Sequence, residues 1–172
     1  MKQRGLSMIE ILVTLTIVAF GLLGILGLQA RALSFQKDSF DRKAAAELVA
    51  QLSEIMRSNQ VGFNEGRYNR DLEAATATPG AVTTCAPPCS YTAVATRDLD
   101  EWLIELRRRL PAAGAYIRWN IADPTAAVVT IAWAEPLAST AVAAQDAACV
   151  ALRGGGAAIP LNYRCYQSRV HP

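Results

Sequence analysis

The chain has 172 residues, of which 52% are hydrophobic, and it carries 17 basic against 15 acidic side chains. That length accommodates one domain of ordinary size together with an anchor, and it argues against two separate cores. The near balance of charge argues against a broad nucleic-acid surface, which would need a basic excess gathered on one face.

The N-terminal segment can span a membrane. From Leu6 to Leu28 every residue except Glu10 is apolar, Gly, Ser or Thr. A helix of this length would extend about 34 Å, enough for a hydrocarbon core of about 30 Å. Lys2 and Arg4 precede the segment, so the positive-inside tendency places the N-terminus in the cytoplasm and the bulk of the chain outside.

Glu10 is the one charged residue in this apolar run. A carboxylate in a membrane helix costs roughly 2.5 to 3.5 kcal/mol at the bilayer centre and needs a partner of opposite charge. No Lys or Arg follows within the segment. Cleavage after Gly5 would make the Leu6 amine a cation that could pair with the Glu10 of a neighbouring helix. We therefore expect Glu10 to be a subunit assembly residue.

The phrase Gly5-Leu6-Ser7-Met8-Ile9-Glu10, with its apolar continuation, resembles the N-terminal signal of type IV prepilins and of the pseudopilins of type II secretion. Leu6 stands where the family usually has an aromatic residue. The resemblance implies that a prepilin peptidase cleaves between Gly5 and Leu6 and methylates the Leu6 amine. It also implies that Glu10 guides subunit docking.

Two alternatives compete with a prepilin leader. An ordinary secretory signal would have a shorter apolar core, of about 7 to 15 residues, followed by a small-x-small cleavage site. The run here is longer and shows no such site before Gln29. A generic single-pass anchored domain would keep residues 1–5 attached, so the mass of the mature N-terminus separates it from a pilin.

The four cysteines, Cys85, Cys89, Cys149 and Cys165, all fall in the part predicted to be exported. An oxidising compartment favours disulfides over free thiols there. Four cysteines allow three connectivities. We expect Cys85 to pair with Cys89 and Cys149 with Cys165, because each pair lies in one loop-rich stretch. Zinc is disfavoured by the Cys85–Cys89 spacing and by the position of the one histidine, His171, at the tail. We expect no metal and no cofactor.

The helical period continues beyond Leu28, so one helix is predicted from about Ser7 to Ser58, with residues 29–59 as its amphipathic continuation. Three glycines inside it, Gly21, Gly24 and Gly27, each weaken the helix by roughly 0.5 to 1 kcal/mol relative to Ala. They favour either close packing against other helices or local loosening during assembly. The sequence leaves both interpretations open.

Residues 60–172 are predicted to form a globular head. A connector over 60–90 lacks periodicity and contains turn residues. A helix over 97–110 is expected next, capped by Thr96 or Asp98 and ended by Pro111. Alternating apolar residues predict an antiparallel hairpin over 115–133 with its turn at Asp123-Pro124, whose apolar face packs on the long helix. A C-terminal loop and strand over 134–172 complete the head, with the strand from Leu161 to Gln167.

Two further phrases, Gly21 to Gln29 and Ala44 to Asn59 ending in Met56-Arg57-Ser58-Asn59, resemble the PilV group of minor pilins. The resemblance implies an α+β, type IV pilin-like fold: a long N-terminal helix, transmembrane in its first half, packed on a small antiparallel sheet with one extra helix. It also implies a subunit that sits in the inner membrane with a periplasmic head and then joins the pilus on the cell surface.

The partners implied are prepilin peptidase, other minor and major pilins, the inner-membrane assembly platform and a tip adhesin. The implied role is priming of pilus assembly, and with it adhesion and twitching motility. A minor pseudopilin of type II secretion is the alternative within the family, and a DNA-binding competence pilin is the alternative from another class. The sequence contains no recognisable catalytic motif, so we expect that the protein is not an enzyme.

Overall fold

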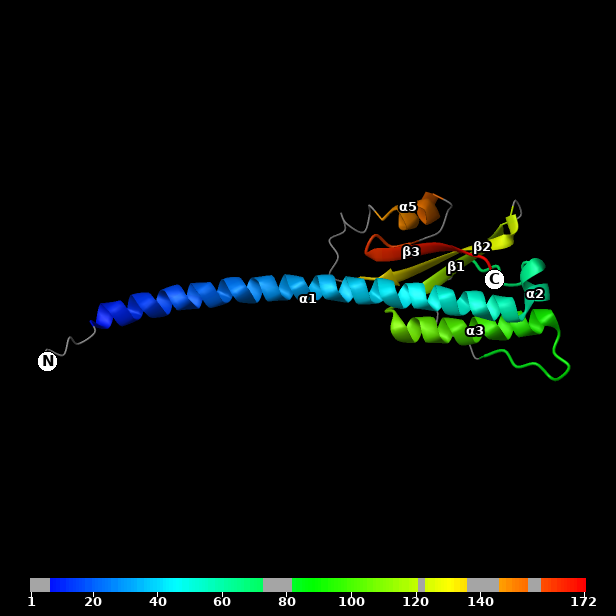
Figure 1. The fold of residues 1–172 in the computed structure, drawn as a ribbon, viewed down its shortest axis with the longest axis horizontal. Coiled ribbons are helices and arrows are strands. Elements are labelled where there is room, and N and C mark those ends of the chain that lie inside the picture. The colour runs from blue at the N-terminus through cyan, green and yellow to red at the C-terminus, as the bar shows by residue number, and fades with distance from the viewer. Residues whose placement is uncertain (1–6, 73–81, 121–122, 136–145, 155–158) are drawn as a thin grey trace. The chain divides into compact units, whose positions relative to one another are not determined.

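The computed structural model describes residues 7–72, 82–120, 123–135, 146–154 and 159–172. The chain divides into two compact units, Met1–Phe40 and Asp41–Pro172, and α1 contributes to both. The elements in chain order are α1 (Met8–Ser58), α2 (Gln60–Asn64), α3 (Tyr91–Arg109), β1 (Gly114–Asn120), β2 (Asp123–Ala134), α5 (Ala147–Gly154) and β3 (Tyr163–Val170) (Figure 1). This is the α+β, pilin-like architecture that the sequence predicts.

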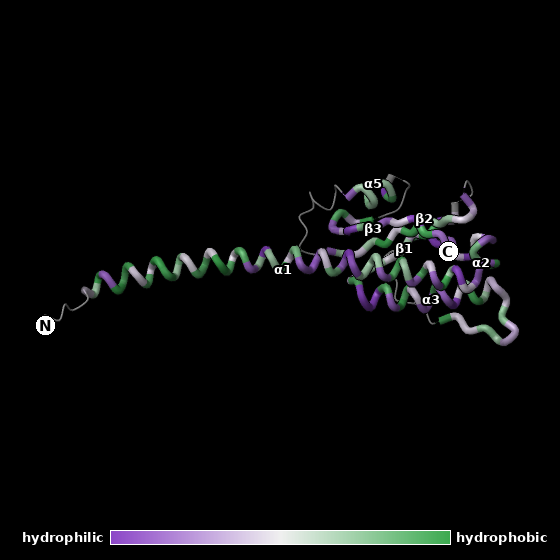
Figure 2. The backbone as a smooth tube through the Cα atoms, viewed as in Figure 1, coloured by the Kyte–Doolittle hydropathy of each residue, from purple (hydrophilic) through white to green (hydrophobic). Residues whose placement is uncertain are grey.

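The helix α1 has two different surroundings along its length. Every residue from 7 to 37 is exposed, and this part of the helix is predominantly apolar (Figure 2). In the second unit the same helix buries one stripe, formed by Ala45, Leu48, Val49, Leu52 and Met56. The spacing of these residues by three and four positions places them on one face, as an amphipathic helix requires.

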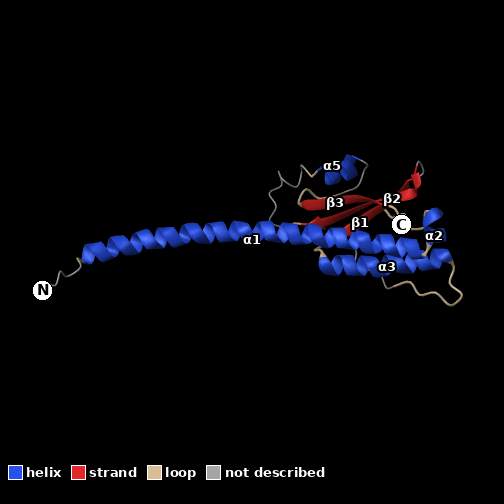
Figure 3. Ribbon diagram, viewed as in Figure 1, coloured by secondary structure: helices blue, strands red, loops and turns tan. Residues whose placement is uncertain are grey.

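The core of the second unit lies between the helices α1 and α3 and one face of the sheet (Figure 3). One apolar stripe of α3 faces this core, and its members Leu99, Trp102, Leu103 and Leu106 are all buried, as is Leu110 directly after the helix. Trp102 also donates its indole N–H to the carbonyl of Leu48 at 2.9 Å. That bond satisfies the polar atom of a large buried ring and ties α3 to α1.

The predicted start of this helix at residue 97 is wrong. Helix α3 begins six residues earlier, at Tyr91, and its N-cap is Ser90, whose hydroxyl accepts the N–H of Ala93 at 3.2 Å. Neither Thr96 nor Asp98 caps it: Asp98 lies inside the helix and accepts the hydroxyl of Tyr68 at 2.9 Å. The first turns lack the dense apolar stripe of the later ones, so the periodicity begins after the helix does.

The sheet has the strand order β1-β2-β3, and both pairings are antiparallel. Ile117, Val129 and Ile131 face the helical core, as the predicted hairpin requires. The predicted turn at Asp123-Pro124 is wrong, because both residues belong to β2 and Asp123 pairs with Asn120. The oxygen Oδ1 of Asp123 accepts hydrogen bonds from both the hydroxyl and the N–H of Thr125. Such local bonding is typical of turns, but here it lies at the first residues of β2.

The opposite face of the sheet carries a second, smaller core formed by Ala132, Cys149, Leu152, Ile159, Tyr163 and Cys165. Helix α5 supplies Cys149 and Leu152, and it occupies a region that the sequence predicts as loop. The last strand covers Tyr163–Val170 instead of the predicted 161–167. Part of the C-terminal loop is therefore an ordered helix that packs on the sheet.

Both expected disulfides are present, Cys85–Cys89 and Cys149–Cys165. The first closes a short loop immediately before α3. The second joins α5 to β3 inside the smaller core, where both cysteines are buried. The other two connectivities that four cysteines allow do not occur.

The three arginines that end α3 are held by groups of the same unit. Arg109 donates to the Glu47 carboxylate of α1 at 2.6 Å, Arg108 lies 3.5 Å from Glu105, and Arg107 donates to the carbonyl of Ala113 at 3.4 Å. The hydrogen bond from Arg109 lowers the pKa of the Glu47 carboxyl below its usual value of 4.5. The triple arginine thus has a structural role at the end of a helix, where cations are favourable.

Removal of the Cys149–Cys165 disulfide should destabilise the second unit more than removal of Cys85–Cys89. Closing the longer loop is expected to contribute about 3 kcal/mol and the shorter about 2 kcal/mol through the entropy of the unfolded chain. The paired Cys→Ala variants can be compared by urea unfolding of the detergent-solubilised chain. Tryptophan fluorescence reports the second unit alone, because Trp102, Trp119 and Trp133 all lie there. Equal losses of unfolding free energy in the two variants would contradict this prediction.

Glu47→Gln should lower the melting temperature of the second unit at neutral pH, by no more than a few degrees because the pair is solvent-exposed. A lowered folded-state pKa gives stability that is present above the usual value of 4.5 and is lost as pH falls through the folded value. The difference from wild type should therefore vanish in acid. Glu54→Gln, which removes a pair confined to α1, is the matched control and should have the smaller effect at neutral pH. A deficit of Glu47→Gln that persists unchanged in acid would contradict the pairing.

Candidate assembly site on the N-terminal helix

The beginning of α1 is organised by Ser7. Its carbonyl accepts the N–H groups of Glu10 at 3.0 Å and of Ile11 at 3.3 Å, which closes the first turn of the helix. Gly5 and Leu6, the predicted processing site, lie outside the described residues. The predicted cut therefore falls two residues before Met8, where α1 begins.

Glu10 lies in the first turn of α1 and is exposed. A negative charge is favourable at this end of a helix, because the unpaired N–H groups of the first turn carry partial positive charge. Within the described ranges, the Glu10 carboxylate makes no hydrogen bond and no ion pair. The chain positions the charge on an open surface, available to a group from another molecule.

The other polar side chains nearby behave differently. The hydroxyl of Thr14 donates to the carbonyl of Ile11 at 2.9 Å, and that of Thr16 donates to the carbonyl of Leu12 at 2.8 Å. Such bonds satisfy a hydroxyl within its own helix and make it compatible with an apolar environment. Glu10 therefore stands out from Thr14 and Thr16 as a polar group whose partner this part of the helix does not supply.

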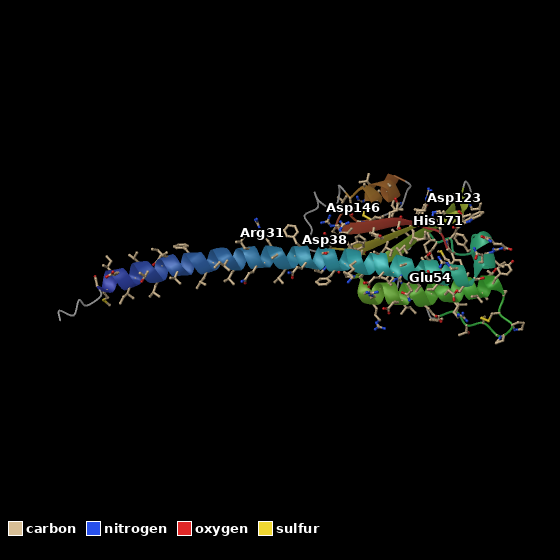
Figure 4. The ribbon with its side chains drawn as sticks, viewed as in Figure 1. Arg31, Asp38, Glu54, Asp123, Asp146 and His171 are labelled. Atoms are coloured by element: carbon tan, nitrogen blue, oxygen red, sulfur yellow. A yellow bond between two sulfur atoms is a disulfide. The ribbon has the colours of Figure 1, made fainter. Side chains whose placement is uncertain are left out.

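The surface around Glu10 is predominantly apolar. Side chains project outward all along this part of α1 (Figure 4). A shallow groove runs along one face, lined by Leu12, Leu15, Thr16, Ala19, Phe20 and Leu23. These residues recur at steps of three and four, so the groove follows the helix axis and fits the side chains of another helix or of lipid. By length and composition, α1 is able to cross a membrane.

No contact within the described part of the chain requires a glycine at the three glycine positions of this segment. A Cβ atom added to Gly21, Gly24 or Gly27 would meet nothing within 4 Å. Their small size therefore bears on contacts with other molecules or on the stability of the helix itself. Both interpretations that the sequence allows remain compatible with this geometry.

Two residues that the sequence does not single out as functional accept hydrogen bonds from the backbone of the sheet. Asp146 accepts the N–H of Ala148 at the start of α5 and the N–H of Cys165 on β3, each at 3.2 Å. Asn69 accepts the N–H of Trp119 on β1 at 2.6 Å. Asp146 could have been found, since an Asp directly before an apolar run is an N-cap signal. Asn69 follows no such local pattern.

The arrangement is suited to binding other molecules. In the described part of the chain no group of three or more His, Cys, Asp or Glu residues could hold a metal ion. The features that carry chemistry are a long apolar surface, a carboxylate in its first turn that pairs with no described residue, and a second unit stabilised by disulfides and buried side chains. Such features can make contacts with other molecules.

Comparison with known families gives two adjacent matches. Residues 1–26 match the prokaryotic N-terminal methylation motif, and residues 27–100 match the family described as type IV pilin Tt1218-like. No curated protein and no solved structure gives a match. The two matched ranges together include all of α1 and α2 and the first half of α3. With the long apolar helix and the small antiparallel sheet, they identify the chain as a type IV pilin-like protein that carries the prepilin N-terminal methylation motif.

Proposed function

We propose that this chain is a structural minor pilin that takes part in the assembly of a type IV pilus. The observation that carries the proposal is the exposed apolar part of α1, with Glu10 as its one charge between Leu6 and Ala30. Such a surface must be covered by lipid or by other helices, because contiguous apolar patches of this size are not left in water. Lipid would cover this surface before assembly, and the helices of other pilins would cover it afterwards.

Processing is the first step. Prepilin peptidase cleaves the peptide bond between Gly5 and Leu6 on the cytoplasmic side and methylates the new Leu6 amine. Residues 1–5 leave as the leader, and the mature chain begins with a cation near the start of an apolar helix. The match of residues 1–26 to the N-terminal methylation motif supports this step.

Docking is the second step. The Glu10 carboxylate of one subunit pairs with the Leu6 amine of a neighbouring subunit, and the apolar helix faces close around the pair. In a low-dielectric surrounding an unpaired carboxylate is costly, so the pair favours correctly placed neighbours over misplaced ones. The exposed position of Glu10 and the absence of a partner for it among the described residues support this role.

The finer assignment is to the PilV group. In this role the subunit primes assembly with other minor pilins at the inner-membrane platform and joins the pilus together with a tip adhesin, which supports adhesion and twitching motility. The phrases at Gly21–Gln29 and at Ala44–Asn59 support it. The N-terminal methylation motif is shared with pseudopilins, so a minor pseudopilin of type II secretion is the second candidate.

Glu10→Gln tests the docking step, because it removes the charge and keeps the shape of the side chain. The variant should reach the membrane fraction at the wild-type level, since a neutral residue inserts at least as easily. Its amount in sheared pili should fall about tenfold, which corresponds to about 1.4 kcal/mol of lost docking free energy. Quantitative immunoblots of membrane and sheared fractions measure both.

Glu54→Gln makes the same chemical change on the same helix, within the second unit, and should leave incorporation unchanged. Wild-type amounts of Glu10→Gln in sheared pili would contradict the docking role. If deletion of the gene abolishes protein secretion and leaves pili intact, the pseudopilin alternative replaces the pilus assignment.

A further inference from the structure

The outer edge of β1 is closed by other parts of the chain. Strand residues whose backbone groups point away from β2 must find partners elsewhere. Ile117 exchanges two hydrogen bonds of 2.9 Å with Arg70, and the N–H of Trp119 is accepted by the side chain of Asn69. Ala115, the remaining outward position of this kind, is buried. No partner strand can reach the middle of this edge.

The first half of the outer edge of β3 is closed in the same way. The N–H of Tyr163 is accepted by the carbonyl of Pro160 at 3.2 Å. The N–H of Cys165 is accepted by Oδ2 of Asp146, also at 3.2 Å. A turn and a capping carboxylate therefore occupy this half of the edge.

No described residue pairs with the backbone of the second half of the β3 edge. Because outward positions alternate along a strand, Gln167 and Arg169 follow Cys165 in pointing away from β2. No described residue accepts the N–H of Gln167 or of Arg169, and both residues are exposed. The carbonyl of Arg169 receives only a long bond of 3.4 Å from the hydroxyl of Ser168. The guanidinium of Arg169 lies 3.9 Å from Asp123 of β2, so its charge is directed to the next strand.

An open stretch of this kind fits one class of partner. Exposed strand edges are usually shortened, charged or covered, because they pair with other chains. N–H and C=O groups at strand spacing are complementary to another extended backbone, which adds to the sheet as a further strand. We propose that the edge at Gln167–Arg169 receives a short extended segment of a neighbouring subunit in the assembled state. The proposal rests on the proposed function, which brings such subunits side by side.

Amide hydrogen exchange tests the pairing without any substitution. The N–H groups of Gln167 and Arg169 should exchange freely in the detergent-solubilised chain and at least about tenfold more slowly in assembled pili, because pairing requires local opening before exchange. The N–H of Cys165 is the internal control, since Asp146 protects it in both states. Mass spectrometry with fragmentation that preserves the label resolves the three positions.

Gln167→Pro tests the same edge by assembly. Proline removes the outward N–H and costs no bond to β2, and edge positions tolerate it. Gln167→Ala is the matched control, because both variants lose the bond from the Gln167 side chain to the Thr130 hydroxyl and only one loses the N–H. Incorporation into sheared pili should fall at least about fivefold for Gln167→Pro relative to Gln167→Ala, with equal melting temperatures in detergent.

The outcomes separate the two proposals. If the wild-type chain is absent from every assembled fraction, the proposed function fails, and the pairing within such an assembly fails with it. If the chain is incorporated but both edge amides exchange as fast as in detergent, the edge proposal alone is overturned. If Gln167→Pro does not fold, the exchange of the wild-type amides still decides the question.

Discussion

The structure depends on one constraint: no described residue of the chain covers the apolar surface of the first part of α1. A helix whose side chains are exposed from residue 7 to residue 37, most of them apolar up to Leu28, needs a cover from outside. Glu10 adds a second demand, because a carboxylate within such a cover requires a cation. In the proposed function, a membrane and then the helices of other subunits meet both demands in succession. The pilin assignment follows from these demands as well as from the family matches.

The second unit differs from the first part of α1, because it buries its apolar side chains within itself. The stripe of α1 from Ala45 to Met56, the apolar face of α3 and one face of the sheet form its main core. The Cys149–Cys165 disulfide fixes α5 over the other face. Polar side chains such as Asn69 and Asp146 close the edges of the sheet. A head built in this way can offer a few defined contacts, of which the β3 edge at Gln167–Arg169 is the one proposed.

Much of this could be predicted from local sequence. The extent of α1, the buried stripe of α3 and the alternation of Ile117, Val129 and Ile131 are direct consequences of helical and strand periodicity. The disulfides followed from the closeness of each pair along the chain. The start of α3 was missed because its first turns lack a continuous apolar stripe, although Ser90 carried the capping signal. Helix α5 was missed because it is only eight residues long, about two turns, which gives a helical period too few repeats to be recognised. The roles of Asn69 and of the Arg70 bridge depend on contacts distant in sequence, which no local pattern reports.

The N-terminal mass of the mature protein tests the central claim most directly. The chain should be purified from membranes of cells with and without prepilin peptidase, and its N-terminal peptide measured by mass spectrometry. The account predicts a chain that begins at Leu6 with one added methyl group when the peptidase is present, and a chain that retains residues 1–5 when it is absent. A mature protein that keeps Met1 to Gly5 in the presence of the peptidase would contradict it.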